Sequence, residues 1–230
     1  AYGTTGSNTA ISNLVNSSGV VASDTSGVGT ARQGLAGATY GGDKAIFAYG
    51  DSGSVTAISN LVNNSGVIAT DVSAVGTGRY GTGAVKYGGS GQAIFAYGFA
   101  GGASSLSNLI SNVGVVAADV TGVGTARWYV AAASYGVDKA VFGYGYTGSA
   151  PSSLTDKVSN TGIVATDTTG VGTARNSLAA TSYGGDKAIF GFGEGVSKVG
   201  ITNLVNNTGT VGADVSAVGT ARSALAAAGY

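Results

Sequence analysis

The segment Val28-Gly29-Thr30-Ala31-Arg32 recurs along this chain as Val-Gly-Thr-x-Arg, ending also at Arg79, Arg127, Arg175 and Arg222. The intervals between these arginines are 47, 48, 48 and 47 residues. A second marker, the apolar residue that opens segments such as Ile-Ser-Asn-Leu-Val, has the same intervals; it lies at Ile11, Ile58, Leu106, Leu154 and Ile201. A period of this length indicates one supersecondary unit repeated along the chain.

Each repeat contains four short apolar segments separated by turns of Gly, Asn and Ser. Between Arg79 and Arg127 these segments predict strands at about 80–87, 92–98, 104–111 and 115–126. The second segment is apolar on both faces, as expected for a strand whose sheet is stacked between neighbouring sheets. The sequence therefore predicts an all-β, five-bladed β-propeller with four antiparallel strands per blade, formed as a single domain by residues 1–230.

All five repeats show a family resemblance, and one of them serves as the example. Residues 173–193 read Thr-Ala-Arg-Asn-Ser-Leu-Ala-Ala-Thr-Ser-Tyr-Gly-Gly-Asp-Lys-Ala-Ile-Phe-Gly-Phe-Gly, which resembles a kelch repeat in its Arg before the first strand and its glycines after the second. The resemblance implies a kelch-like propeller fold, and no kelch function is inferred from it. The near-identical copies also resemble repetitive propellers of phages and uncultured microbes, and the size is similar to that of five-bladed lectins such as tachylectin.

The ends of the chain suggest how the propeller closes. The segment Lys-Ala-Ile-Phe, or a variant of it, occurs four times, ending at Phe47, Phe95, Phe142 and Phe190, whereas the other segments occur five times. The chain opens with Ala1-Tyr2-Gly3, the tail of that strand, and ends at Tyr230, where a fifth first strand ends. We therefore expect a composite fifth blade shared between residues 1–31 and 223–230, which would remove open sheet edges.

Composition argues against several classes of function. The chain has 11 basic and 11 acidic residues, so no net charge attracts it to nucleic acid. It has no His and no Cys, and so lacks the usual general base, the commonest metal ligand and any thiolate. From these absences we predict a protein that is not an enzyme and has no cofactor and no metal. We also predict no membrane insertion, because its apolar runs are only a few residues long.

Charged residues recur in a fixed relation, each Asp standing eight residues before an Arg. The pairs are Asp24 and Arg32, Asp71 and Arg79, Asp119 and Arg127, Asp167 and Arg175, and Asp214 and Arg222. One interpretation is five identical anion sites. The other is a structural pair, within or between blades, that fixes the outer strand by charge-assisted hydrogen bonds. We favour the structural interpretation, because a residue present in every repeat usually serves the fold that all repeats share.

Differences among the repeats predict a binding face. In an antiparallel meander, the loops between second and third strands lie at the same end of the sheet as the connections between repeats. These two sets of loops vary most, and they carry aromatic residues typical of binding hot spots. We predict a binding face formed by Tyr80, Phe99, Trp128, Tyr129 and Tyr146. Relaxed drift of exposed loops is the alternative explanation.

Two functions fit these observations. The first is a non-enzymatic display or interaction scaffold with a protein partner, for example as a tail or capsid appendage of a phage virion. The second is a lectin that binds a cell-surface glycan at several equivalent pockets, where multivalency converts weak binding into avidity. The sequence leaves the location open, with a virion or an extracellular surface as the settings considered.

Overall fold

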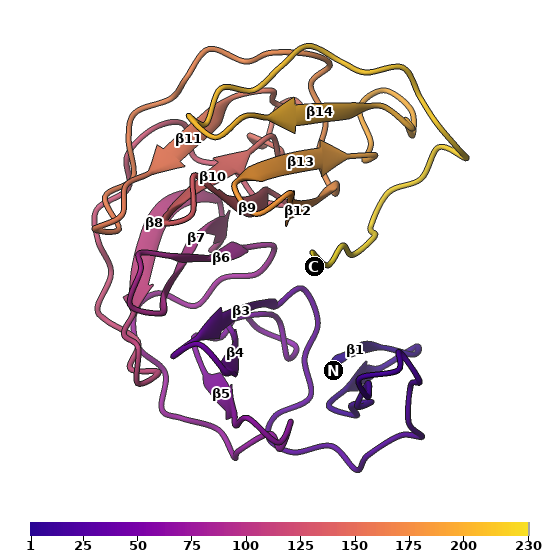
Figure 1. Ribbon diagram of the computed structural model, residues 1–230. Coiled ribbons are helices and arrows are strands. Elements are labelled where there is room, and N and C mark those ends of the chain that lie inside the picture. The colour runs from indigo at the N-terminus through magenta and orange to yellow at the C-terminus, as the bar shows by residue number, and fades with distance from the viewer. Residues whose placement is uncertain (230) are drawn as a thin grey trace.

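The computed structural model describes residues 1–229, and within them the chain is all-β and contains no helix. Four three-stranded antiparallel sheets and one two-stranded sheet follow one another along the chain. Figure 1 shows these sheets arranged around a common centre, with the C-terminal segment running toward it. This architecture of small repeated sheets is the coarse fold that the sequence predicts.

The strands are as follows. The first sheet contains β1 (Gly3–Thr4) and β2 (Asn8–Thr9), and the second contains β3 (Ala36–Tyr40), β4 (Lys44–Ala48) and β5 (Ser59–Val62). The third contains β6 (Gly83–Tyr87), β7 (Gln92–Phe99) and β8 (Ala103–Ile110). The fourth contains β9 (Ala131–Tyr135), β10 (Lys139–Gly143) and β11 (Thr155–Val158), and the fifth contains β12 (Ala179–Tyr183), β13 (Lys187–Gly191) and β14 (Thr202–Val205).

The predicted fourth strand of each repeat is only partly formed. Its segment touches the third strand at two isolated bridges, which in the third repeat are Ser107 to Val120 and Ile110 to Val116. The bridges lie three residues apart on one side and four apart on the other, so one extra residue bulges out and interrupts the ladder. The prediction of four regular strands per blade was therefore wrong in this respect: each complete sheet has three strands and a bulged outer segment.

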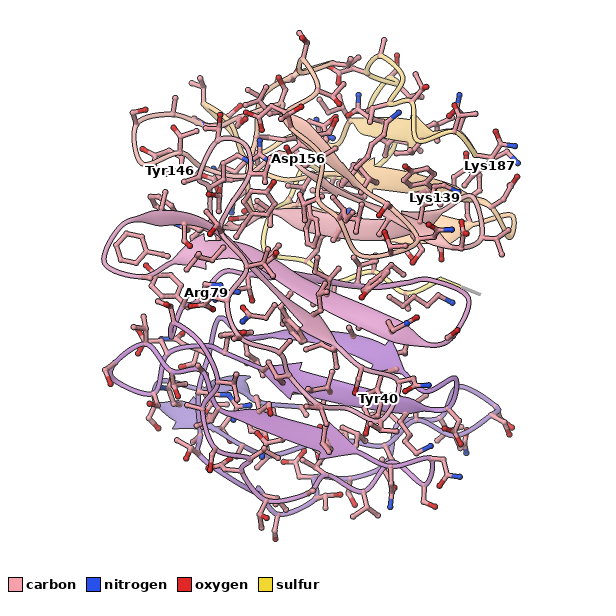
Figure 2. The ribbon with its side chains drawn as sticks, turned by 90° about the vertical axis from the view of Figure 1, so that its left-hand side faces the viewer. Tyr40, Arg79, Lys139, Tyr146, Asp156 and Lys187 are labelled. Carbon is pink, nitrogen blue, oxygen red and sulfur yellow. The ribbon has the colours of Figure 1, made fainter. Side chains whose placement is uncertain are left out.

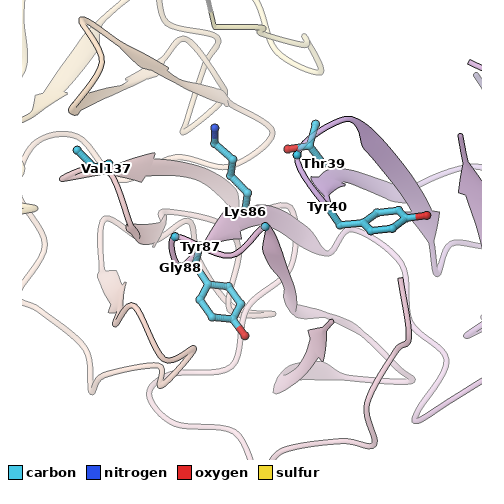
Figure 3. Close-up of a pocket in the computed structure, with 9 residues that line it drawn as sticks. Thr39, Tyr40, Lys86, Tyr87, Gly88 and Val137 are labelled. Atoms are coloured by element: carbon cyan, nitrogen blue, oxygen red, sulfur yellow. The ribbon is translucent and has the colours of Figure 1, made fainter. Parts of the chain in front are cut away.

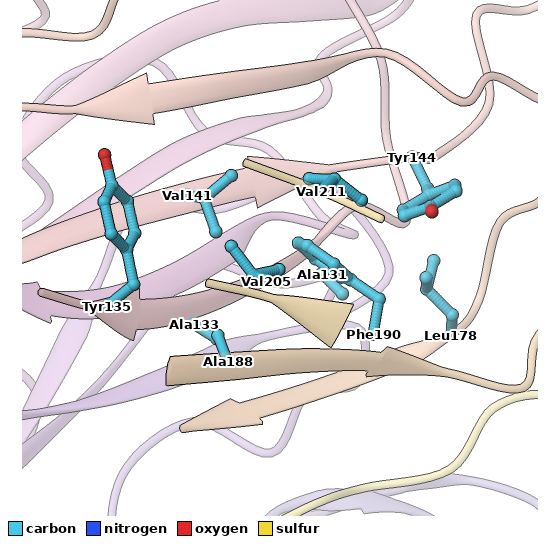
Figure 4. Packing of buried hydrophobic residues seen from close by; sticks show 10 residues of the cluster. All are labelled: Ala131, Ala133, Tyr135, Val141, Tyr144, Leu178, Ala188, Phe190, Val205 and Val211. Atoms are coloured by element: carbon cyan, nitrogen blue, oxygen red, sulfur yellow. The ribbon is translucent and has the colours of Figure 1, made fainter. Parts of the chain in front are cut away.

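The hydrophobic core lies between neighbouring sheets. Figure 4 shows one such layer, in which Tyr135, Val141 and Tyr144 from the β9–β11 repeat face Phe190 and Val205 from the next. The aromatic residues on and beside the middle strands contribute fully buried side chains to this core: Phe95, Phe142, Phe190, Tyr49, Tyr97 and Tyr144. Each Tyr meets the Phe of the following repeat at ring-centroid distances of 5.2–5.5 Å.

A buried arginine connects each pair of neighbouring repeats. Arg79 is fully buried, donates from Nε to the carbonyl of Tyr97 at 2.8 Å, and lies 4.3 Å from the centroid of the Tyr49 ring. Its Nη2 also donates to Oδ1 of Asn108 on β8. The same arrangement surrounds Arg32 and Arg175. The arginines are thus part of the packing between sheets.

The aspartates do not pair with the arginines that stand eight residues after them in the sequence. Ion pairs join Arg79 to Asp119 at 3.7 Å, Arg127 to Asp167 at 3.6 Å and Arg175 to Asp214 at 4.0 Å, each linking one repeat to the next. The two residues of an eight-residue pair do not meet, because a glycine with positive φ, such as Gly76 at 77°, bends the chain between them. Each of these ion pairs therefore joins residues of neighbouring repeats.

The composite fifth blade is not observed. Residues 223–229 form no strand, and residues 1–31 contain β1, β2 and the bridges Ser12 to Thr25 and Val15 to Val21. Arg222 and Asp24 are exposed and make no ion pair with each other. Tyr230, the predicted end of this blade, lies outside the described residues. The structure accordingly establishes the repeated sheets without closure of a ring.

Candidate functional site

The two ends of the sheets form different faces of the molecule. Figure 2 shows Tyr146 on one side and Lys139 and Lys187 on the other. The lysine side carries the tight hairpin turns between the first two strands of each sheet, where Lys139 pairs with Asp138 at 2.8 Å and Lys187 with Asp186 at 2.9 Å. The Tyr146 side carries the loops that differ among the repeats.

The five aromatic residues singled out in the sequence lie together on this variable side. Their rings form one continuous chain of contacts, with centroid distances of 6.0 Å for Tyr129 and Tyr80, 5.3 Å for Tyr80 and Phe99, 5.1 Å for Phe99 and Trp128, and 5.0 Å for Trp128 and Tyr146. Tyr129 is exposed and the other four are partly exposed. We call this set the aromatic face.

Backbone pairing explains why these residues meet. In each complete repeat, the residue after the recurring Arg forms an antiparallel bridge with a residue at the end of the middle strand or in the loop that follows it. Tyr80 pairs in this way with Phe99, and Trp128 with Tyr146. The corresponding pairs in the other repeats are polar, Gln33 with Asp51 and Asn176 with Glu194. The aromatic face is therefore a feature of the third and fourth sheets, built on a backbone position that all complete repeats share.

A cavity of about 500 Å³ opens beside the aromatic face, where the five repeats meet. Equivalent residues from five repeats line it, among them the set Gly34, Gly81, Tyr129, Ser177 and Ala224. Successive members of this set are joined by amide-to-carbonyl hydrogen bonds of 2.7–3.2 Å, from Gly81 to Gly34 and onward to Ala224. We call this the axial cavity.

Tyr129 has an unusual backbone conformation. Its φ is 54°, in the left-handed region, and the four equivalent positions share it: φ is 62° at Gly34, 63° at Gly81, 52° at Ser177 and 55° at Ala224. The left-handed conformation is disfavoured for residues with a Cβ and is common for Gly. Because Ser177 and Ala224 adopt it as well, the conformation belongs to the repeated backbone and does not distinguish Tyr129. The Tyr129 ring lies 6.0 Å from the Tyr80 ring, and Tyr129 borders the axial cavity.

A second, smaller cavity of about 220 Å³ lies against the same tyrosines. It is lined by Tyr80, Tyr129, Gln33, Asp51 and Gly34, so Tyr129 and Gly34 border both cavities. The lining combines two aromatic rings with an amide and a carboxylate. Small ligand sites commonly combine apolar surface with a few polar groups that fix orientation. Partial burial raises the pKa of the Tyr129 hydroxyl above its ordinary value.

The opposite side has a cavity of about 420 Å³, shown in Figure 3. Tight glycine turns form much of its wall, together with Tyr40, Tyr87 and Lys86. The rings of Tyr40 and Tyr87 are buried, and burial raises the pKa of both hydroxyls. Lys86 supplies the only charged side chain of the lining residues.

Two further findings concern the described residues as a set. No group of three or more acidic residues among residues 1–229 is placed to hold a metal ion. No helix long and apolar enough to cross a membrane occurs in the same part of the chain.

Sequence reasoning missed two features of the site. The axial cavity was not expected, although the recurring small residues after the conserved Arg, such as Gly34 and Ala224, are its wall. The contribution of Gln33 and Asp51 was also missed, because polar residues in loops are not by themselves a signal of binding. Their bridge to each other would have been found by aligning them with Tyr80 and Phe99, which occupy the same positions.

In comparisons with known proteins, no protein-family model matches the chain and no curated protein matches it. The kelch-like resemblance is thus restricted to the repeated all-β sheets, and family membership is not assigned.

Proposed function

We propose that this protein is a non-enzymatic binding module that recognises a protein partner through its aromatic face. The observation that carries the proposal is the unbroken chain of five aromatic rings from Tyr129 to Tyr146 on one side of the sheets. Aromatic rings supply large contact area at low conformational cost, and Trp and Tyr are enriched at binding hot spots. The absence of His and Cys from the sequence favours binding over catalysis.

The experiment is panning of a displayed-peptide library against the immobilised protein. We expect peptides enriched on the wild type to lose at least 10-fold in affinity for the double variant Trp128→Ala and Tyr129→Ala. The matched control is Tyr183→Ala, which removes an aromatic ring at the end of β12, on the hairpin-turn side. Equal binding to the wild type and to the double variant contradicts the proposal.

A glycan-binding lectin is the second candidate, favoured by the small cavity beside Tyr80 and Tyr129. Its Gln33 and Asp51 side chains offer an amide and a carboxylate next to aromatic rings, a lining able to bind sugar hydroxyls. A glycan array separates the candidates: the lectin requires a signal that Asp51→Ala abolishes. An array without signal at high protein concentration removes this candidate and leaves the protein-binding proposal intact.

We also propose that the repeated sheets close into a five-bladed propeller through residues 1–31 and 223–230. Each of four neighbouring interfaces has a Thr whose hydroxyl donates to an Asp of the next repeat at 2.6–2.7 Å: Thr30 to Asp71, Thr77 to Asp119, Thr125 to Asp167 and Thr173 to Asp214. The remaining members of this series are Thr220 and Asp24. Their pairing would complete the ring, because one repeated head-to-tail contact either closes or continues into a filament.

The closure proposal is tested by cross-linking. The chain has no Cys, so cysteines can be placed at Thr220 and Asp24 without competing thiols. We expect a short thiol cross-linker to join them within one molecule, as it joins cysteines at Thr173 and Asp214, the positive control. Exclusively intermolecular products at Thr220 and Asp24, with intramolecular products in the control, would show an open chain that associates end to end.

A further inference from the structure

Residues 12–15 present an unpaired strand edge. This segment is the third strand of the N-terminal repeat, and its outer edge is bridged through Ser12 to Thr25 and Val15 to Val21. In each complete sheet the equivalent segment also pairs on its inner edge with the middle strand, as Ile110 pairs with Ala93 and Val205 with Ala188. Among residues 1–229, no segment pairs with the inner edge of residues 13–15.

Exposure of the side chains shows that a neighbour is absent at this position. Val15 is 63% exposed, whereas its equivalents Ile110, Val158 and Val205 are 0% exposed. Asn13 is also exposed, although its equivalents Asn60 and Asn108 are fully buried. Val15 further lines an open cavity of about 420 Å³ with Leu14 and Val20. An apolar strand edge of this kind is a template for pairing with another chain.

The last aromatic residue of a recurring series also lacks its usual ring partner. In four repeats, an aromatic residue after the middle strand meets the Phe of the next middle strand; the pairs are Tyr2 with Phe47, Tyr49 with Phe95, Tyr97 with Phe142, and Tyr144 with Phe190. Phe192 is the fifth member of this series. It contacts the Arg222 guanidinium, 3.7 Å from the ring centroid, and borders a cavity of about 260 Å³ with Leu225 and Ala226.

These exposed surfaces together match the contacts that a middle strand makes in the complete repeats. A middle strand pairs with a first strand and a third strand, and places its Phe against the preceding repeat. The first-strand segment here is residues 226–229, the third-strand segment is residues 12–15, and the aromatic ring is Phe192. We infer that these three surfaces form an acceptor site for an extended peptide that carries the repeat's own middle-strand sequence, Lys-Ala-Ile-Phe.

Two physical features make the inferred occupant specific. Main-chain hydrogen bonds to an open edge give affinity in strand addition, and pockets for alternate side chains give specificity. The peptide's Phe would lie against Phe192, in the geometry that the four aromatic pairs share. By the register of β4 on β3, the peptide's Ala and the Gly after its Phe would pair with Gly229 and Ala226, the equivalents of Thr39 and Ala36. The inference rests on the proposed closure, which brings residues 226–229 and 12–15 to either side of one strand.

The test is fluorescence anisotropy with the labelled peptide Gly-Gly-Asp-Lys-Ala-Ile-Phe-Gly-Phe, a copy of residues 184–192, titrated with the 230-residue protein. We expect saturable binding, and at least 10-fold weaker binding of a peptide in which the first Phe is replaced by Asp. Hydrogen exchange should slow at residues 12–15 and 224–229 when the peptide is bound. Equal binding of both peptides, no binding, or protection elsewhere in the chain overturns the inference.

Variants of the protein locate the site. Val15→Asp should weaken peptide binding at least 10-fold. The matched control Val113→Asp changes a residue that is 69% exposed in a turn of the third repeat, and should leave binding unchanged. Trp128→Ala with Tyr129→Ala should also leave peptide binding unchanged, since the aromatic face is a separate site. Peptide binding that fails although the Thr220 and Asp24 cysteines cross-link within one molecule refutes this inference alone.

Discussion

Asp156 is the one residue that departs from an otherwise constant buried position. The equivalent residues Asn60, Asn108 and Asn203 each accept a hydrogen bond from an Arg and donate to a backbone carbonyl. A carboxylate cannot make that donation, and Oδ1 of Asp156 is buried without a partner. Its Oδ2 contacts the Arg127 guanidinium. Burial, opposed by the charge of Arg127, raises the pKa of Asp156 to about 6.

The first prediction is that Asp156→Asn stabilises the protein. The amide restores the pattern of the other repeats, and we expect a gain of about 1 kcal/mol at pH 7, the typical size of one buried hydrogen bond. Urea unfolding measures this gain. The reciprocal variant Asn108→Asp should lower the stability of the third repeat by a similar amount. An unchanged or lower stability of Asp156→Asn contradicts the prediction.

Asp156 also gives stability a pH dependence of definite sign. The folded state holds the proton up to about pH 6, whereas an unfolded Asp loses it near pH 3.9. Between these values the folded state binds more protons, so the free energy of unfolding should fall as pH rises through this window. Urea titrations at intervals from pH 4 to 7 measure the slope. In Asp156→Asn this downward slope should disappear; a slope that persists assigns it to another group.

At the scale of the element, the outer segments depend on glycines for two reasons. Their backbone is left-handed, and at some of them a Cβ would collide with a neighbouring side chain. Gly76 and Gly19 have the same φ of 77°, but their surroundings differ. A Cβ at Gly76 would collide with the Asp119 carboxylate and lie 2.8 Å from Nδ2 of Asn108, whereas a Cβ at Gly19 has no neighbour within 4 Å. These two positions separate the cost of the left-handed backbone from the cost of the collision.

We therefore predict that Gly76→Ala is more destabilising than Gly19→Ala. The left-handed backbone alone costs a residue with a Cβ about 1–2 kcal/mol, so Gly19→Ala should fall near this value. Gly76→Ala should exceed it by at least about 1 kcal/mol, because it also displaces Asp119 from its hydrogen bonds to Thr77 and Asn108. Urea unfolding of the two variants, compared with the wild type, measures the difference. Equal losses would show that Asp119 moves aside freely.

How far the elements could be predicted depends on which residues carry a local signal. The hairpins follow from turns such as Tyr-Gly-Gly-Asp-Lys between apolar segments, and β7 at Gln92–Phe99 lies within a residue of its prediction. The bulge in the outer segment could not be predicted, because it is set by where Ser107 and Ile110 bridge across to Val120 and Val116. The aromatic residues of the site could be identified from differences among the repeats. The axial cavity could not, because it depends on how all five repeats pack together.

At the scale of the whole molecule, the contacts between repeats give stability a second pH dependence. Burial raises the pKa of Asp71, Asp119 and Asp214, but hydrogen bonds from a Thr and an Asn outweigh it, so each pKa is lowered overall. Asp167 is likewise lowered, through hydrogen bonds that include Asp156 and Thr125. The four carboxylates therefore stabilise the charged, folded state at every described interface between repeats.

The resulting prediction is loss of stability in acid. An Asp with a lowered folded pKa contributes stability above its unfolded pKa near 3.9, and this contribution is lost as pH falls through the folded value. Asp156 has the opposite effect, since it lowers the free energy of unfolding as pH rises above about 4. We therefore expect the wild type to be most stable near pH 4 to 5. Urea unfolding between pH 2.5 and 7 measures the optimum. Asp119→Asn should reduce the acid loss, and an acid limb unchanged in that variant contradicts the assignment.

The sameness of the Thr-to-Asp contacts also has a consequence for the gene. Because Thr30 holds Asp71 just as Thr173 holds Asp214, removal of one whole repeat from the coding sequence would join a Thr to an equivalent Asp. A chain shortened or lengthened by whole repeats would therefore retain every local contact of this kind. No single residue contact distinguishes one length from another.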